Sequence, residues 1–143
     1  MLLKKPLLVY DGECALCIYW VKRWRNVIGN KIDYAPLQRV ARHFPKVPER
    51  RFHESVILIE PGGQTFSGAR AVFESLAFGG RRYWLWLYKN LSGFALTSEA
   101  AYTTISRNRP FFYHLTIFFI EIFPYWLLII VAILTVMAVL KVF

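Results

Sequence analysis

The feature that most constrains this chain is an uncharged apolar run near its C-terminus. From Ile122 to Leu140, nineteen consecutive residues carry no formal charge, in the order IFPYWLLIIVAILTVMAVL. A helix needs about 20 apolar residues to cross a hydrocarbon core of about 30 Å, and Tyr125 and Trp126 suit the aromatic belt at the membrane interface. A buried core helix is the alternative, but a domain of this size could hardly cover one on all sides. The sequence therefore predicts a transmembrane helix.

The span is expected to cross the membrane once. Phe111 to Phe143 comprises 33 residues, or about 50 Å as a helix, which is too short for two crossings of about 30 Å each. We expect the part before Pro124 to begin the same helix near the interface, and Pro124 to bend it. The chain then divides into a domain over residues 1–110 and a juxtamembrane segment and transmembrane helix over residues 111–143, with the span at about 122–140.

Charge predicts the orientation of this span. The chain carries eighteen Lys and Arg against nine Asp and Glu, and only Lys141 of the basic residues follows the span. The positive-inside bias places the N-terminal domain in the cytoplasm, and the first residues, MLLKKPLLVYDGEC, do not resemble a signal peptide. The basic residues are scattered over expected helices and juxtamembrane positions. Membrane lipid accounts for them better than nucleic acid, which is not expected as a partner.

The first third of the chain has the pattern of a β-α-β unit. Leu7 to Tyr10 predicts a buried strand, ended by an Asp11–Gly12 turn. Apolar residues at helical spacing predict a helix from about Ala15 to Ile28, with Cys17 at the head of its apolar stripe. Lys31 to Ala35 resembles a second strand, which a helical crossover places parallel to the first.

The rest of the pattern completes a mixed sheet. Residues 36–54 are expected to form a short basic helix or loop, and Ser55 to Ile59 a strand that turns back into residues 64–66. A helix is expected from Gly68 to Gly79, and Ser98 is predicted to cap another that runs to Arg107. The order indicates an α/β thioredoxin-like architecture, a mixed sheet with flanking helices, plus one C-terminal transmembrane helix.

Residues 81–91 combine aromatic rings with cations. Trp84, Trp86 and Tyr88 lie between Arg81 and Lys89. Such a helix suits a lipid headgroup surface, and packing on the domain core is the alternative.

The two cysteines, Cys14 and Cys17, stand at the predicted start of the first helix. Unpaired N–H groups and the helix dipole favour an anion there, and hence a thiolate. We expect Cys14 to be reachable from solvent and Cys17 to be buried, which is the arrangement of an attacking and a resolving thiol. The carboxylates of Asp11 and Glu13 oppose the dipole. Asp11 either accepts a proton from a thiol or caps the turn.

Other uses of this cysteine pair are less well supported. A structural zinc site takes four ligands, and only His43, His53 and His114 could complete one, at spacings unlike those of zinc fingers. No metal is therefore expected. Inert core cysteines are a further alternative, and the reducing cytosol argues against a structural disulfide.

Four ordered stretches carry a family resemblance. They are Asp11 to Cys17 (DGECALC), Tyr34 to Gln38 (YAPLQ), Ser67 to Ala71 (SGARA) and Tyr102 to Arg109 (YTTISRNR). Together they resemble the DCC family of thiol–disulfide oxidoreductases, named for its D-x-x-C-x-x-C signature, over about residues 7 to 110. The resemblance implies a thioredoxin-like domain with Cys14 and Cys17 as redox pair and no further cofactor. The proline that thioredoxin-like enzymes usually place just before the third strand is not evident.

Two functions are consistent with these features. The leading one is a membrane-anchored thiol–disulfide oxidoreductase in which Cys14 attacks, Cys17 resolves and Asp11 assists proton movement, with a protein thiol or disulfide as partner. The alternative is a non-catalytic accessory subunit of a larger membrane complex, which packs through its aromatic surface and its transmembrane tail.

Overall fold

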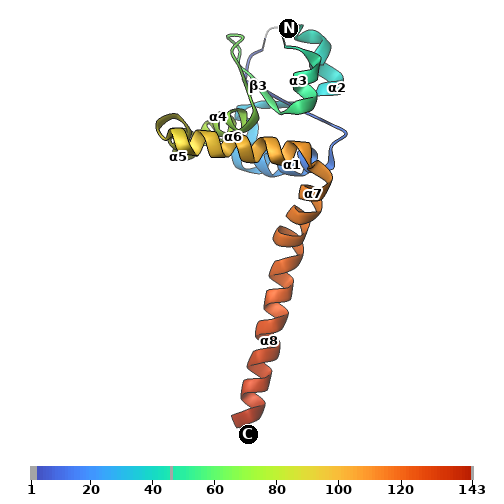
Figure 1. Cartoon of the computed structure of the whole chain (residues 1–143), viewed down its shortest axis with the longest axis vertical. Coiled ribbons are helices and arrows are strands. Elements are labelled where there is room, and N and C mark those ends of the chain that lie inside the picture. The colour runs from blue at the N-terminus through green and yellow to red at the C-terminus, as the bar shows by residue number, and fades with distance from the viewer. Residues whose placement is uncertain (1–2, 46, 143) are drawn as a thin grey trace. The chain divides into compact units, whose positions relative to one another are not determined.

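The computed structural model describes residues 3–45 and 47–142, and the chain divides into two compact units, Met1–Arg109 and Pro110–Phe143. The described strands lie in the first unit together with helices α1 to α6, and the second unit is helical (Figure 1). Each unit is described by itself below.

The N-terminal unit is built on a four-stranded sheet in the order β2-β1-β3-β4. β1 (Leu7–Tyr10) pairs in parallel with β2 (Asp33–Pro36) and antiparallel with β3 (Ile57–Ile59), and β3 forms a hairpin with β4 (Thr65–Ser67). The β-α-β unit and the hairpin are both as predicted. The mixed sheet with its flanking helices confirms the thioredoxin-like architecture.

Two of the flanking helices match the sequence prediction closely. α1 (Ala15–Ile28) has the predicted bounds, and α4 (Gly68–Phe78) begins at Gly68 and ends before Gly79. The basic segment between β2 and β3 forms α2 (Leu37–Val40), the 3-10 turn η2 (Ala41–His43) and α3 (Glu49–Glu54). A further 3-10 turn, η1 (Gly29–Lys31), joins α1 to β2.

The sheet is buried on both faces, because successive strand residues point to opposite sides. The layer shared with α1 and α4 consists of Leu8, Leu58, Phe66, Val21, Ile28 and Ala71, with Ile32 and Val56. The layer shared with α2 and α3 consists of Leu7, Val9, Ile57, Ile59, Leu37 and Phe52, with Val47. Strands of only three or four residues can therefore hold the unit together from both sides.

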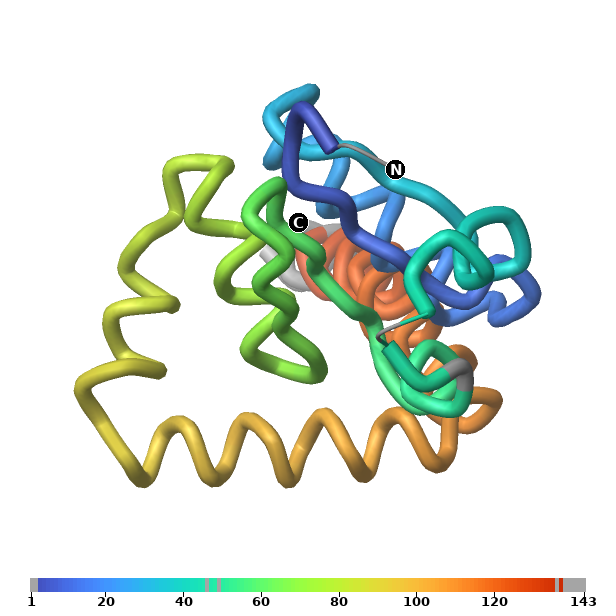
Figure 2. The backbone as a smooth tube through the Cα atoms, turned by 90° about the horizontal axis from the view of Figure 1, so that it is seen from above, coloured from blue at the N-terminus to red at the C-terminus, as the bar shows by residue number. Residues whose placement is uncertain are grey.

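α6 (Ser92–Arg107) begins earlier than predicted. Ser98 was expected to cap it, but Ser98 lies inside the helix, whose N-cap is Leu91. That prediction was wrong because tertiary packing fixes the first turn, where the Phe94 ring contacts Phe73 and Trp84. Figure 2 shows α6 running along one side of the unit, from α5 at its start to the neighbourhood of α3 at its end.

The aromatic segment forms α5 (Arg82–Asn90), which packs on the domain. The Trp84 ring stacks on Phe94 with centroids 6.3 Å apart, and Tyr88 contacts Phe73 at 5.7 Å. Tyr83 and Trp86 remain 64% and 56% exposed. The helix thus contributes to the packing of the domain and also presents two rings to its surroundings.

The C-terminal unit is one continuous helical stretch. α7 (Arg109–Ile117) leads through a π-helical turn, η3 (Phe118–Ile122), into α8 (Phe123–Val142). In the π turn the N–H of Phe123 donates to the carbonyl of Phe118, five residues earlier. A π turn here is understandable because Pro124 has no N–H to donate to the carbonyl four residues before it.

Length and composition make this helix a candidate membrane span. The stretch Arg109–Thr135 is long and apolar enough to cross a bilayer, and none of its most apolar window is buried by the protein. It overlaps the span that the sequence predicts at about residues 122–140.

The conformation of Gly68 allows a direct test of this packing. Gly68 has φ +66, and a Cβ there would lie 2.6 Å from Oε2 of Glu99, whereas Gly80 has φ +89 with nothing within 4 Å of a Cβ. Each Gly→Ala change carries the left-handed penalty of about 1–2 kcal/mol. Gly68→Ala also displaces the Glu99 carboxylate, which accepts from the N–H groups of Ala69 and Arg70. We expect Gly68→Ala to lower the melting temperature of the domain more than Gly80→Ala, measured by near-UV circular dichroism. Equal losses would contradict this account of the contact.

Candidate functional site

Cys14 is the N-cap residue of α1. Its backbone is extended (φ −88, ψ 112), and the N–H of Cys17 donates to its Sγ over 3.2 Å. Its carbonyl accepts the first helical bond, from Ile18, at 3.0 Å. A three-residue loop after β1 therefore delivers a sulfur atom to the helix N-terminus, where unpaired N–H groups and the dipole favour negative charge.

Cys17 lies one turn into α1, and its thiol donates to Sγ of Cys14 with the two sulfurs 2.6 Å apart. Burial, the hydrogen bond to Cys14 and the charge on Cys14 raise the pKa of Cys17 above its ordinary value of 9.0, while Arg109 acts in the opposite direction. Both cysteines are free and half-buried. The expected contrast between an exposed Cys14 and a buried Cys17 was therefore wrong, and the two thiols differ instead in hydrogen bonding.

The loop before Cys14 is clamped against the end of β2 by Gln38. Its Oε1 accepts from the N–H of Gly12 at 3.1 Å, and its Nε2 donates to Oδ1 of Asp11 at 3.1 Å. A Cβ on Gly12 would lie 2.7 Å from Cβ of Pro36, so the loop can approach β2 this closely only with glycine there.

The carboxylate of Asp11 joins this loop to Arg109, the first residue of α7. Its Oδ1 also accepts from the N–H of Glu13 at 3.0 Å, and its Oδ2 pairs with Nη1 of Arg109 at 3.0 Å. The paired side chains are only 17% and 20% exposed. Within the described residues, no hydrogen bond joins the Asp11 side chain to either cysteine. Asp11 thus caps its turn, and the assistance to a thiol proton that the sequence also suggested for it stays a prediction.

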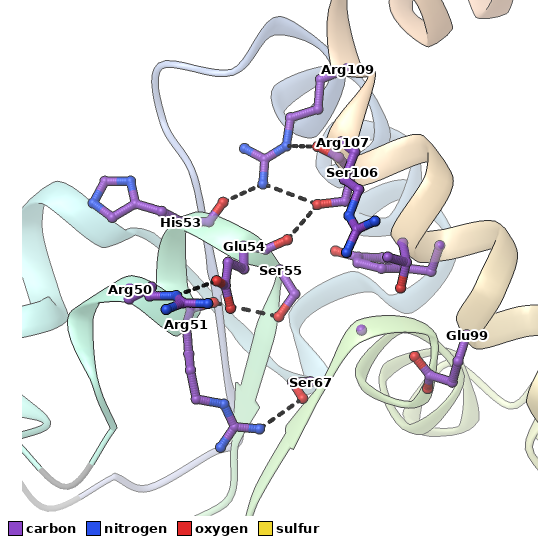
Figure 3. A pocket seen from close by; sticks show the side chains of 13 residues that line it. Arg50, Arg51, His53, Glu54, Ser55, Ser67, Glu99, Ser106, Arg107 and Arg109 are labelled. Carbon is purple, nitrogen blue, oxygen red and sulfur yellow. Dashed lines mark hydrogen bonds and ion pairs between the residues drawn. The ribbon is translucent and has the colours of Figure 1, made fainter.

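Arg109 contacts three separate segments of the domain. Besides Asp11, its Nε donates to the carbonyl of Ser106 at 3.1 Å, and its Nη2 donates to the carbonyl of His53 and to Oγ of Ser106 (Figure 3). Burial alone lowers the pKa of Arg109, but the charges of Cys17, Cys14 and Asp11 outweigh it and raise that pKa. The guanidinium is therefore a fixed positive charge close to the cysteine pair.

Tyr102 of α6 packs against the core layer that the sheet shares with α1 and α4. Its hydroxyl accepts from the N–H of Val56 at 2.9 Å. Burial, with a contribution from the charge of Cys17, raises the pKa of Tyr102 to about 12, although the bond from Val56 acts against this. The phenol therefore stays protonated over the range in which thiols react.

The start of α4 is capped from a distance by Glu99. Its Oε2 accepts from the N–H of Ala69 at 3.2 Å and its Oε1 from the N–H of Arg70 at 3.0 Å, while the Tyr88 hydroxyl donates to Oε1 at 2.8 Å. The first N–H groups of α4 thus donate to a side chain of α6, because the N-cap residue of α4 makes no side-chain capping bond.

The structure brings together the four sequence stretches that carried the family resemblance. The predicted site residues Asp11, Cys14 and Cys17 lie on one loop and helix start. Sequence reasoning missed Gln38 and Arg109 as their neighbours, although both lay in stretches already singled out. The missing information was spatial, since Arg109 is 98 residues from Asp11. Among the residues that the structure describes, no three His, Cys, Asp or Glu side chains gather in a group that could hold a metal ion.

A sheet of thioredoxin-like topology that presents a C-x-x-C pair at a helix N-terminus defines a thioredoxin-like dithiol protein. The family model of the DCC1-like thiol-disulfide oxidoreductases matches residues 8–114, and the chain belongs to this family. Searches of curated proteins and of solved structures gave no match to the chain. The family expected from the sequence is thus confirmed.

The raised pKa of Cys17 has a measurable consequence. A Cys14→Ser variant lacks the bond and the charge of Cys14 but keeps burial, which is the leading cause of the raised pKa of Cys17. In this variant we expect iodoacetamide to modify Cys17 slowly at pH 8, because the thiol is still protonated there, and faster as the pH rises above 9.0. The same variant unfolded in urea provides the control, in which Cys17 should react at the rate of an ordinary thiol. Mass spectrometry of timed samples gives both rates. Equal rates in folded and unfolded protein would contradict the assignment.

Proposed function

We propose that the protein is a thiol–disulfide oxidoreductase anchored in a membrane, with Cys14 as attacking and Cys17 as resolving thiol. The observation that carries the proposal is the pair of sulfurs 2.6 Å apart at the N-terminus of α1. Membership of the thiol-disulfide oxidoreductase family supports the redox role. The sequence of events is that of thiol–disulfide exchange.

The chemistry proceeds in two balanced exchanges. The Cys14 thiolate attacks one sulfur of a substrate disulfide, which forms a mixed disulfide and releases one substrate thiolate. Cys17 then loses its proton and attacks Sγ of Cys14, which releases the second substrate thiol and leaves a Cys14–Cys17 disulfide. Two electrons have passed to the substrate. A thiol donor reverses both steps on the protein and restores the dithiol.

Neighbouring groups are suited to distinct roles in these steps. We assign Cys14 as the first nucleophile because it is the N-cap residue of α1, where its sulfur accepts hydrogen bonds from the backbone and from the thiol of Cys17. Asp11 and Arg109 exert opposite effects on Cys17. In our proposal Asp11 assists the departure of the Cys17 proton, and Arg109 stabilises the charge that develops on Cys17.

The helix of the C-terminal unit supplies the anchor in this proposal. Its length and apolar character support a single crossing, and the excess of basic residues before it supports a cytoplasmic N-terminal domain. A reducing compartment would keep the pair as a dithiol, so the protein would act as a reductant or a sensor. Membrane lipid and a protein thiol or disulfide are the proposed partners.

The roles of the two cysteines are tested by trapping. A Cys17→Ser variant should accumulate mixed disulfides through Cys14, because no thiol remains to resolve them, whereas Cys14→Ser should accumulate few. Non-reducing electrophoresis of the full-length protein from cells quenched with N-ethylmaleimide measures both, and the double Cys→Ser variant gives the background.

The same experiment separates the two candidate functions. A non-catalytic accessory subunit, supported by the exposed rings of Tyr83 and Trp86, predicts no difference between the single variants. Equal trapping, or none above the background, would therefore reject the oxidoreductase and leave the accessory role.

The orientation is tested by labelling. A membrane-impermeant maleimide added to intact cells should not reach Cys14 and should label it after lysis. In a background without Cys14 and Cys17, a Val142→Cys variant provides the matched control, because a single crossing places residue 142 on the opposite side, where intact cells should be labelled. Labelling of Cys14 in intact cells would reverse the proposed orientation.

A further inference from the structure

A cavity of about 620 Å³ lies in the N-terminal unit beside the site. Its lining residues come from α3 and the residue after it, from the end of β4 and the start of α4, from α6, and from Arg109 at the start of α7 (Figure 3). Its volume falls within the range of about 300–1,000 Å³ that small-molecule sites occupy. The cysteines do not line it, so nothing in the thiol chemistry accounts for it.

The lining of this cavity is polar and predominantly cationic. Its charged side chains are four arginines and two glutamates, namely Arg50, Arg51, Arg107, Arg109, Glu54 and Glu99. Hydroxyl and imidazole groups complete the wall, at His53, Ser55, Ser67, Tyr102, Thr103 and Ser106. Small-molecule sites are usually lined mostly by apolar side chains, so a wall of this kind is suited to a charged, hydrogen-bonding ligand.

Internal pairing leaves two of the arginines available. Arg50 pairs with Glu54 at 2.5 Å and Arg109 pairs with Asp11 at 3.0 Å, while Glu99 is occupied by the start of α4. Among the side chains that the structure describes, which do not include that of Glu49, neither Arg51 nor Arg107 has a carboxylate partner.

These two arginines reach the cavity from different elements. Arg51 of α3 donates from Nη2 to Oγ of Ser67 at 3.2 Å, which holds its side chain against β4. Arg107 extends from the end of α6 toward the space between α6 and α3 (Figure 3). A guanidinium presents a planar fork of donors that matches the two oxygens of a carboxylate or phosphate. Two such groups on the wall of one cavity suit an anionic ligand.

The cavity shares part of its wall with the redox site. Tyr102 and Arg109 line it, and the pKa of each responds to the charge of Cys17. A ligand in the cavity would therefore lie next to two groups whose pKa values respond to the charge of Cys17.

We propose that this cavity binds a small molecule that carries a carboxylate or phosphate group, held by Arg51 and Arg107. Four arginines around one cavity, two of them without a carboxylate partner, are the observation that carries the proposal. It is independent of the thiol chemistry proposed above, since binding does not require either cysteine to react.

Binding is tested with the reduced full-length chain in nanodiscs of zwitterionic lipid. Inorganic phosphate and succinate are the probes, titrated separately at constant ionic strength and followed by isothermal calorimetry. We expect saturable binding of at least one probe, weakened about tenfold or more by Arg51→Gln combined with Arg107→Gln. The matched control is Arg81→Gln combined with Arg82→Gln, which removes the same charge from exposed positions at the start of α5 and should bind as the unchanged protein does.

The experiment can overturn the proposal in three ways. Absence of saturable binding of both probes would reject the site, and equal weakening by the control would show non-specific attraction to a basic protein. Tighter binding of hexaglutamate than of either probe would assign the cavity to an acidic peptide instead. Arg107→Gln alone serves as a second variant that should still fold, because the Arg107 side chain makes no hydrogen bond or ion pair within the described part of the chain. An unchanged melting temperature together with weaker binding supports the proposal.

Discussion

The ion pair between Arg109 and Asp11 is the contact on which the arrangement of the site depends. It joins the loop after the first strand to a residue 98 positions later, and its side chains are largely shielded from water. The same guanidinium holds the carbonyl of His53 at the end of α3 and that of Ser106 at the end of α6. Removal of one partner from a shielded pair leaves the other charge uncompensated. The cysteine loop, α3 and α6 are therefore positioned together by one side chain.

The N-termini of α1 and α4 are capped in unusual ways. Their free N–H groups bond to a sulfur atom or to a side chain from a distant part of the sequence. The sulfur of Cys14 accepts the N–H of Cys17 where a serine or aspartate oxygen would ordinarily cap the helix. The carboxylate of Glu99 does the same for α4 from another helix. Since a sulfur at a helix start is both cap and reactive atom, the local fold and the chemistry of this site share one set of contacts.

Regular patterns of the sequence predicted most of the fold. Short apolar runs and helical spacing located β1, α1, β3 and α4, and glycines marked the bounds of α4. The predicted start of α6 was wrong because serine is favoured at N-caps but also occurs inside helices. The packing of the Phe94 ring fixes the first turn of the helix instead. In the site, the position of Cys14 followed from local sequence. The clamp by Gln38, the pair with Arg109 and the partial burial of both thiols did not, because each depends on segments that only the tertiary fold brings together.

The π turn at Phe118–Ile122 changes what a mutation can do to the C-terminal helix. Each residue of an α-helix advances the direction of its side chain by about 100°, and a π turn accommodates one residue more than an α turn. The side-chain directions of residues after the turn are therefore shifted about the helix axis relative to those of residues before it. A helical face predicted by continuing one regular period through the turn would be correct on one side of the turn and wrong on the other. Deletion of a single residue within the turn would restore the α register and rotate one half about the axis by about 100°. Substitutions leave that register in place. A change of length by one residue is therefore the mutation that rotates one half of this helix relative to the other.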